Sequence, residues 1–101
     1  MLNKEEIKEI AKRYVKEIQE EINIELIILS EMTINKSYGS IYFWGAKDSK
    51  KHRLAGNGPF LVESKAGRVL QFGTADPTEY YITQYENGTW KPGSNDVWYP
   101  N

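Results

Sequence analysis

The chain has 101 residues, of which 40% are hydrophobic and 27% charged, and its net charge is −1. This length favours a single domain with one core, and the composition is that of an ordinary folded protein and excludes disorder for most of the chain. The near-zero charge gives no reason to expect nucleic acid or a membrane surface as a partner. Because the chain has no cysteine, disulfides, thiolate zinc sites and cysteine nucleophiles are excluded.

The beginning of the chain, MLNKEEIKEI, becomes charged at once and lacks the apolar stretch of a signal peptide. No apolar run of the sequence approaches the roughly 20 residues that span a bilayer. We therefore expect a cytoplasmic protein without a membrane partner, and the lack of cysteine favours the same compartment.

Apolar residues recur at spacings of three and four near the N-terminus, which predicts an amphipathic helix over residues 4–21. Asn3 and Glu6 have the spacing of a capping box at its start. The apolar stripe consists of Ile7, Ile10, Ala11, Tyr14, Val15, Ile18 and Ile22.

β-Branched and aromatic residues then predict strands over residues 22–34, 40–46, 60–64 and 68–73. The last two form a hairpin around the turn 64–67, where Gly67 is free to take a positive φ. A second helix follows, with Asp76 as N-cap, Pro77 as the first helical residue and Gly88 after its end. The segment DVWY, 96–99, offers a fifth strand at the edge of the sheet.

This order of elements is typical of an α+β fold with an N-terminal helix, a mainly antiparallel four-stranded sheet and a C-terminal helix. We expect one domain over 1–101, with 88–101 as a C-terminal tail. The simplest packing places both helices on one face of the sheet, formed by Ile24, Leu26, Ile28, Ile41, Phe43, Phe60, Val62, Leu70 and Phe72. The opposite face is then left for the tail, for a partner or for a second copy in a homodimer. It consists of Glu25, Ile27, Leu29, Tyr42, Trp44, Leu61, Glu63, Val69 and Gln71.

The stretch LAGNGPFLV, 54–62, resembles a phosphate-binding loop at first sight. It lacks the third glycine of the dinucleotide fingerprint, it precedes a strand, and Pro59 removes a backbone N–H. The stretch is therefore interpreted as a turn into a strand. The predicted structural turn residues are Gly56, Asn57, Gly58, Pro59, Gly67 and Gly73.

The segment KDSKKHR, 47–53, contains four cationic side chains and one aspartate, and it lies between acidic ends of the chain. It also contains His52, the single histidine. One histidine without an oriented partner builds neither a convincing base nor a metal site, so we expect no cofactor and no metal. A nucleic-acid interface is a weak interpretation because the patch is short. A solvated loop and attraction to an acidic protein surface remain alternatives.

The segment LAGNGPFLVESKAGRVLQFGTADPTEYYITQYE resembles the second half of the immunity protein 35 family of bacterial toxin–immunity systems, also called YrhB-like domains. That family combines an A-G-N-G-P element, a strand, a turn, a strand ending in G-T-A, then proline and an E-Y helix. The matching positions here are Ala55 to Pro59, Lys65 to Gly67, Gly73 to Ala75, Pro77, and Glu79 with Tyr80. In pattern, the resemblance extends over about residues 4 to 86.

The resemblance implies a small non-enzymatic protein that binds a cognate toxin domain and neutralises it. It identifies no binding residues. From exposed aromatic groups and charge, we predict a partner-binding surface made by Tyr42, Trp44, Lys47, Lys50, Lys51, His52, Arg53, Trp90 and Trp98. The alternatives are a chaperone-like or stress-related housekeeping protein and, more remotely, a small enzyme that uses His52.

Overall fold

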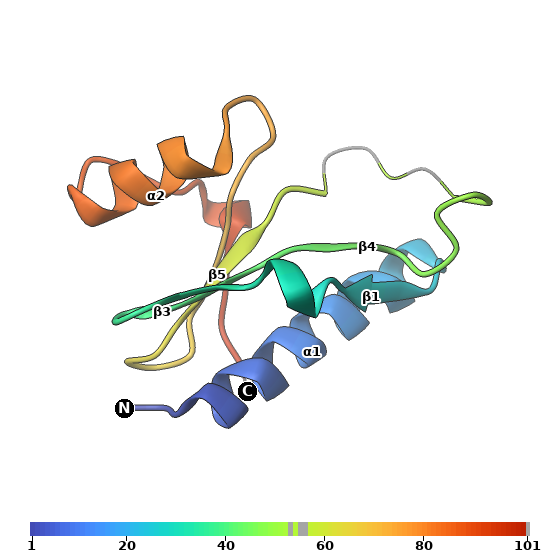
Figure 1. Cartoon of the computed structure of the whole chain (residues 1–101), viewed down its shortest axis with the longest axis horizontal. Coiled ribbons are helices and arrows are strands. Elements are labelled where there is room, and N and C mark those ends of the chain that lie inside the picture. The colour runs from blue at the N-terminus through green and yellow to red at the C-terminus, as the bar shows by residue number, and fades with distance from the viewer. Residues whose placement is uncertain (53, 55–56, 101) are drawn as a thin grey trace.

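The computed structural model of the chain describes residues 1–52, 54 and 57–100, and it shows an α+β fold (Figure 1). The helical elements are α1 (Lys4–Ile22), the 3-10 helix η1 (Ser30–Met32), α2 (Thr78–Glu86) and the 3-10 helix η2 (Ser94–Asp96). The strands are β1 (Leu26–Ile28), β2 (Ile34–Lys36), β3 (Gly39–Tyr42), β4 (Trp44–Ala46), β5 (Phe60–Glu63), β6 (Val69–Gln71) and β7 (Val97–Trp98).

Five strands form one antiparallel sheet in the order β2-β3-β5-β6-β7, and β1 pairs with β4 in a separate two-stranded sheet. The predicted hairpin is formed by β5 and β6, with Gly67 at φ 74° in its turn. A Cβ on this glycine would lie 2.6 Å from Ile10 Cδ1, so the residue also allows α1 to approach the turn. The tail returns to the sheet as β7, the edge strand that the sequence offered.

Helix α1 has nearly the predicted bounds, and it begins with a complete capping box. The Asn3 side chain accepts a hydrogen bond from the Glu6 N–H at 2.9 Å, and the Glu6 carboxylate accepts one from the Asn3 N–H at 3.0 Å. This exchange satisfies two of the N–H groups that a helix start leaves without partners. The residues of the apolar stripe that are fully buried are Ile7, Ile10, Ala11 and Val15.

The two α-helices cover opposite faces of the five-stranded sheet, so the prediction that they share one face is wrong (Figure 1). The sheet and strand residues buried on the α1 side are Leu26, Tyr42, Trp44, Phe60, Val62 and Val69. The residues buried on the α2 side are Ile41, Leu61 and Leu70 of the sheet and Phe72, directly after β6. Of the face that was expected to be open, Tyr42, Trp44 and Val69 are buried on the α1 side, and Leu61 is buried on the α2 side.

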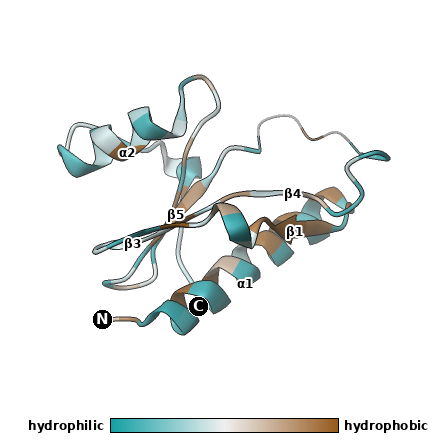
Figure 2. Ribbon diagram, viewed as in Figure 1, coloured by the Kyte–Doolittle hydropathy of each residue, from teal (hydrophilic) through white to brown (hydrophobic). Residues whose placement is uncertain are grey.

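The error arises from strand register. Ile41 lies opposite Leu61, and Leu61 lies opposite Leu70, so these three side chains share one face. The predicted core face grouped Ile41 with Phe60 instead, which is a shift of one residue. Both faces of the central strands are apolar where β5 crosses the sheet (Figure 2), and the hydrophobic pattern therefore does not distinguish one register from the next.

The strands predicted to form one four-stranded sheet are distributed over two sheets. Helix η1 interrupts the first expected strand, so that β1 and β2 belong to different sheets. Ile28 packs on the α1 side and Ile34 on the α2 side, although a straight strand would place both side chains on one face. The second expected strand continues from β3 to β4 past Phe43 and joins the two sheets.

Helix α2 begins at Thr78, one residue later than predicted. Its N-cap residue is Pro77, no side chain caps its first turn, and the prediction of Asp76 as N-cap is wrong. At the other end, Gly88 has a φ of 71° directly after the C-cap residue Asn87, which is the position that glycine favours.

The amide group of Gln71 connects α1, β6 and the segment before β5. Its Nε2 donates to the carbonyl oxygens of Gly58 at 2.6 Å, Phe72 at 2.9 Å and Pro59 at 3.2 Å. Its Oε1 accepts a hydrogen bond of 2.7 Å from the Tyr14 hydroxyl of α1. Burial, followed by the nearby carboxylates, raises the pKa of Tyr14 to about 12, so the hydroxyl keeps its proton and remains a donor.

We expect Gln71→Leu to lower the free energy of unfolding by about 1–3 kcal/mol, because the substitution leaves several polar groups beneath the sheet without partners. Urea denaturation followed by circular dichroism measures the change. Thr83→Ala on the exposed side of α2 is the control and should change stability by less than about 0.5 kcal/mol. A loss for Gln71→Leu no larger than that of the control would contradict the central role of the amide.

Candidate functional site

The described part of the segment before β5 is packed into the fold. The Trp44 Nε1 donates to the Gly58 carbonyl oxygen at 2.9 Å, and the Asn57 Nδ2 donates to the Trp44 carbonyl oxygen at 3.1 Å. A Cβ on Gly58 would lie 2.5 Å from the carbonyl oxygen of Phe72, so only glycine fits there without displacing the backbone. Asn57, Gly58 and Pro59 thus hold Trp44 and β6 in place. Ala55 and Gly56 lie outside the described residues.

Two of the aromatic residues predicted for partner binding are buried under α1. Tyr42 is 5% exposed and Trp44 is 8% exposed. The one-residue shift in register had placed both on the open face of the sheet. Both residues were predicted to bind a partner because they were expected to be exposed. They belong to the core instead.

Trp90 and Trp98 in the tail are half-buried and lie against opposite faces of the fold. Trp90 makes an edge contact with Phe72, with ring centroids 5.3 Å apart, on the α2 side. Trp98 makes an edge contact with Tyr14 at 5.4 Å, and its Nε1 donates to Glu17 of α1 at 3.1 Å. The two tryptophans therefore fasten the tail to the domain and do not form one surface.

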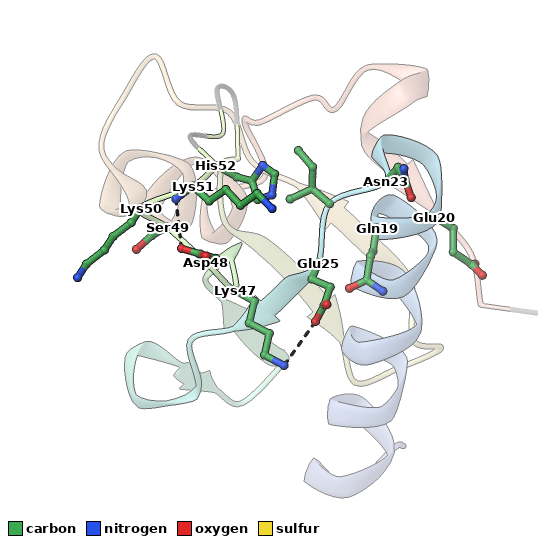
Figure 3. Close-up of a pocket in the computed structure, with 11 residues that line it drawn as sticks. Gln19, Glu20, Asn23, Glu25, Lys47, Asp48, Ser49, Lys50, Lys51 and His52 are labelled. Atoms are coloured by element: carbon green, nitrogen blue, oxygen red, sulfur yellow. Dashed lines mark hydrogen bonds and ion pairs between the residues drawn. The ribbon is translucent and has the colours of Figure 1, made fainter.

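The predicted basic loop lines an open groove at the end of α1, with a cavity volume of about 900 Å³ (Figure 3). Residues 47–52 form one side of the groove, and the other side is formed by Gln19, Glu20, Asn23, Ile24 and Glu25. The Asp48 backbone carbonyl and side chain both accept hydrogen bonds from the Lys51 N–H, at 3.2 and 3.1 Å. The loop is thus a turn organised by Asp48. Arg53, which the sequence analysis added to this surface, lies outside the described residues.

The charges of this groove are mixed. Lys47 forms an ion pair with Glu25 at 3.4 Å across the mouth of the groove, and both side chains are mostly exposed (Figure 3). The side chains of Lys50 and Lys51 are exposed and have no acidic side chain within ion-pair distance in the described part of the chain. An open, polar groove of this kind suits contact with a charged protein surface.

His52 is half-buried at the edge of the same groove. Its backbone N–H donates to the Asp48 carbonyl oxygen at 3.0 Å. Among the residues that the structure describes, no carboxylate or hydroxyl forms a hydrogen bond with its ring, so no partner orients the imidazole as a base.

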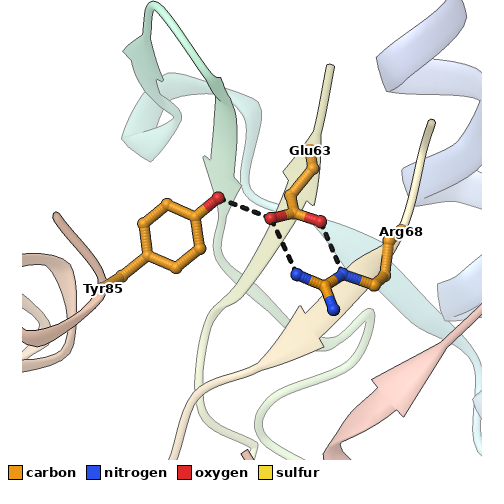
Figure 4. Close-up of polar contacts among 3 residues, drawn as sticks. All are labelled: Glu63, Arg68 and Tyr85. Carbon is orange, nitrogen blue, oxygen red and sulfur yellow. Dashed lines mark hydrogen bonds and ion pairs between the residues drawn. The ribbon is translucent and has the colours of Figure 1, made fainter. Parts of the chain in front are cut away.

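A second polar cluster joins the β5–β6 hairpin to α2 (Figure 4). Arg68 binds both oxygens of the Glu63 carboxylate, with Nε to Oε1 at 2.6 Å and a terminal nitrogen to Oε2 at 3.1 Å. The Tyr85 hydroxyl donates to Oε2 at 2.5 Å. A bidentate pair with a third donor fixes the carboxylate in one position, where it connects the sheet to the helix.

The pKa of Glu63 reflects this arrangement. Burial alone would raise the pKa of the carboxyl, but the hydrogen bonds from Arg68 and Tyr85 outweigh burial and hold the pKa below its ordinary value. Burial, followed by the hydrogen bond to Glu63, raises the pKa of Tyr85. The carboxylate is therefore ionised and the phenol protonated at neutral pH, which is the state in which the cluster is stable.

This cluster was not among the residues predicted from the sequence. Tyr38 extends it, because its ring lies 4.9 Å from that of Tyr85 and its hydroxyl donates to Glu86 at 2.7 Å. The positions of Glu63 and Arg68 on either side of the hairpin turn were a usable signal, since such residues face each other across the strands. The tyrosines gave no comparable signal because their approach depends on how α2 packs.

Among the described residues, no group of three or more histidine, aspartate or glutamate side chains gathers in a way that would hold a metal ion. None of the described helices is long and apolar enough to cross a membrane.

The comparisons with known proteins give one local similarity. A segment of 34 residues is 47% identical to the uncharacterised protein YrhB of Escherichia coli (strain K12). It covers 34% of this chain and 36% of the length of YrhB, so the similarity spans about a third of each protein. No family model matches the chain, and no solved structure matches it. The YrhB-like part of the resemblance thus has partial support, and the similarity to this uncharacterised protein attaches no activity to it.

We expect Glu63→Gln to lower the free energy of unfolding by about 1–2 kcal/mol at pH 7, because a neutral amide replaces the carboxylate that Arg68 and Tyr85 bind. The pKa of Glu63 is lower in the folded state than in the unfolded state. The contribution of the carboxylate is therefore present above the unfolded pKa, about 4.3, and is lost as the pH falls through the folded pKa.

The difference in stability between the parent protein and Glu63→Gln should accordingly shrink as the pH falls below the unfolded pKa, about 4.3, and through the lower folded pKa. Urea titrations across this range measure the difference. Glu31→Gln, at an exposed position in η1, controls for the loss of one carboxylate. A difference that is independent of pH would show that the ionised cluster does not stabilise the fold.

Proposed function

We propose that the protein is an immunity protein that acts in the cytoplasm, where it binds a cognate toxin domain and blocks the active site or a required surface of that domain. The observation that carries this proposal is the ordered pair of elements A-G-N-G-P and G-T-A, at Ala55 to Pro59 and Gly73 to Ala75, within a resemblance to the immunity protein 35 family. The local similarity to YrhB supports the YrhB-like part of that resemblance.

The structure refines the surface that we propose for toxin binding. Tyr42 and Trp44 are excluded because they are buried, and the two tail tryptophans are used in packing. The remaining part of the predicted surface is the basic loop, of which Lys47, Lys50, Lys51 and His52 are described. These residues favour an acidic surface on the toxin and would mainly accelerate association.

The absence of an oriented partner for His52 among the described residues weighs against the enzyme alternative. No particular feature of the structure favours the chaperone-like alternative. A chaperone would protect unrelated proteins from aggregation, whereas an immunity protein binds one toxin with high specificity, so the two functions differ in a measurable way.

The proposal is tested by coexpression with the toxin domains encoded beside this gene. We expect the chain to restore the growth of cells that express its cognate toxin and to copurify with that toxin. If no neighbouring toxin domain is neutralised or copurifies, the immunity function is wrong. Suppression of the thermal aggregation of unrelated proteins, without rescue, would favour the chaperone alternative.

The proposed surface has its own test. We expect replacement of Lys47, Lys50 and Lys51 by glutamate to slow toxin association by about tenfold or more, because attraction becomes repulsion. The matched control replaces Lys4, Lys65 and Lys91, three exposed lysines outside this loop, by glutamate. Stopped-flow or surface-plasmon measurements give the rate constants. Equal effects of the two triple variants would show that only the net charge matters.

A further inference from the structure

A second groove lies between α1 and β1, with a cavity volume of about 420 Å³. Its apolar floor is formed by Val15 of α1 with Leu26 and Ile28 of β1. Strand β1 is coloured as strongly hydrophobic in Figure 2, and Figure 1 shows it alongside α1. This groove is separate from the surface proposed above, although Gln19 borders both.

One edge of β1 is open. The Glu25 carbonyl accepts from the Lys47 N–H and the Leu29 N–H donates to the Phe43 carbonyl, so odd-numbered residues bond to β4. In an antiparallel pair the backbone groups of the alternate residues, Leu26 and Ile28, therefore point away from β4. In the described structure β1 pairs with β4 alone, so this outer edge has no strand beside it.

Gln19 closes one end of that edge. Its side-chain oxygen accepts a hydrogen bond of 2.9 Å from the Leu26 N–H. Among the described residues, no group forms a hydrogen bond with the Ile28 N–H or with the carbonyl groups of Leu26 and Ile28, so a short stretch of the edge is open. A short, partly blocked edge resists indiscriminate pairing between copies of the chain and still accepts a segment whose side chains fit.

Lys8, Lys12 and Lys16 form a row along the groove, one turn apart on α1. Lys12 is paired with Glu9 at 3.2 Å, on a mostly exposed part of the helix. Among the described residues that line the groove, three are lysines and none carries a carboxylate. The groove thus combines an apolar floor with one sign of charge, which is complementary to an acidic partner.

The spacing of the lysines matches that of an extended chain. Residues four apart on a helix are separated by about 6 Å along its axis, and alternate residues of a strand by about 6.5 Å. The side chains of Leu26 and Ile28 pack on the α1 side, whereas Ile27 faces the other way and is 39% exposed. A strand beside β1 would therefore direct alternate side chains toward the lysine row and the others toward the side of Ile27.

We propose that this groove binds an extended acidic segment of a partner protein, which adds as a strand to the outer edge of β1 with alternate carboxylates on Lys8, Lys12 and Lys16. Apolar residues between the carboxylates would lie beside Ile27. The proposal goes beyond the proposed function because it defines the chemistry of the recognised segment and does not require that the partner be a toxin.

The test uses a defined probe, the peptide acetyl-(Glu-Val)3-amide, titrated into the ¹⁵N-labelled full chain and followed by two-dimensional NMR. We expect saturable shifts of the amide signals of Ile28 and its neighbours with a dissociation constant below about 1 mM, which corresponds to about 4 kcal/mol of binding free energy. The peptide acetyl-(Lys-Val)3-amide should not bind. Absence of saturable shifts at β1, or equal binding of the lysine peptide, overturns the proposal.

Two variants test the lysine row. Replacement of Lys8, Lys12 and Lys16 by glutamine, which keeps helix propensity, should weaken binding of the glutamate peptide by tenfold or more. The same replacement at Lys4, Lys65 and Lys91 is the matched control and should change the affinity less than twofold. Equal losses of affinity for the two triple variants would show that only the net charge of the protein matters, and they would overturn the proposed site.

Two further probes test strand addition. A peptide whose central valine is replaced by proline loses an N–H and should bind at least fivefold more weakly. Sodium tripolyphosphate, a polyanion without backbone amides, should bind more weakly and leave the Ile28 amide signal in place. Equal binding of either probe at β1 overturns the strand geometry. Because these titrations involve no toxin, their failure and the failure of coexpression rescue are distinguishable.

Discussion

The amide group of Gln71 joins three parts of the molecule that are far apart in the sequence. It binds the hydroxyl of Tyr14 in α1, the carbonyl groups that precede β5, and a carbonyl of its own segment. The Gly58 carbonyl oxygen also accepts from Trp44, so α1, β4, β5 and β6 meet at one set of hydrogen bonds. Polar groups in such a position cost free energy when they have no hydrogen-bond partner. An arrangement that pairs all of them is therefore favoured over others, and this fixes how α1 lies on the sheet.

Coverage of both faces of the sheet decides where the protein can bind others. With α1 on one face, and α2 and Trp90 on the other, the central strands are not available as a flat surface. The surfaces that remain are edges, loops and the flanks of α1. The two grooves lie there, one beside the loop 47–52 and one beside β1, and both contain exposed lysines although the net charge of the chain is −1. The local arrangement of charge is thus more informative than the total.

Those residues of the family motif that the structure describes stabilise the fold. Gly58 allows the backbone after β6 to approach, the Asn57 side chain binds the backbone of Trp44, and Gly67 shapes the hairpin turn beside α1. Substitutions at these positions would disturb the fold before they disturbed any partner. Similarity in such a motif therefore gives information on the fold. It gives none on the lysine row of α1, where we propose that a partner segment binds.

The sequence by itself determined the elements that local rules govern, namely the amphipathic α1 with its capping box and the β5–β6 hairpin, and it offered an edge strand in the tail, which forms as β7. The lysine row was also visible there as a four-residue spacing, but nothing in the sequence placed it beside an open strand. Only the tertiary structure decided that the helices lie on opposite faces, that η1 splits one expected strand between two sheets, and that Tyr42 and Trp44 are buried. The physical reason is that both faces of the central strands are apolar. The hydrophobic pattern therefore fits two registers that differ by one residue equally well. Long-range contacts such as the hydrogen bond of Tyr14 with Gln71 select the register that forms.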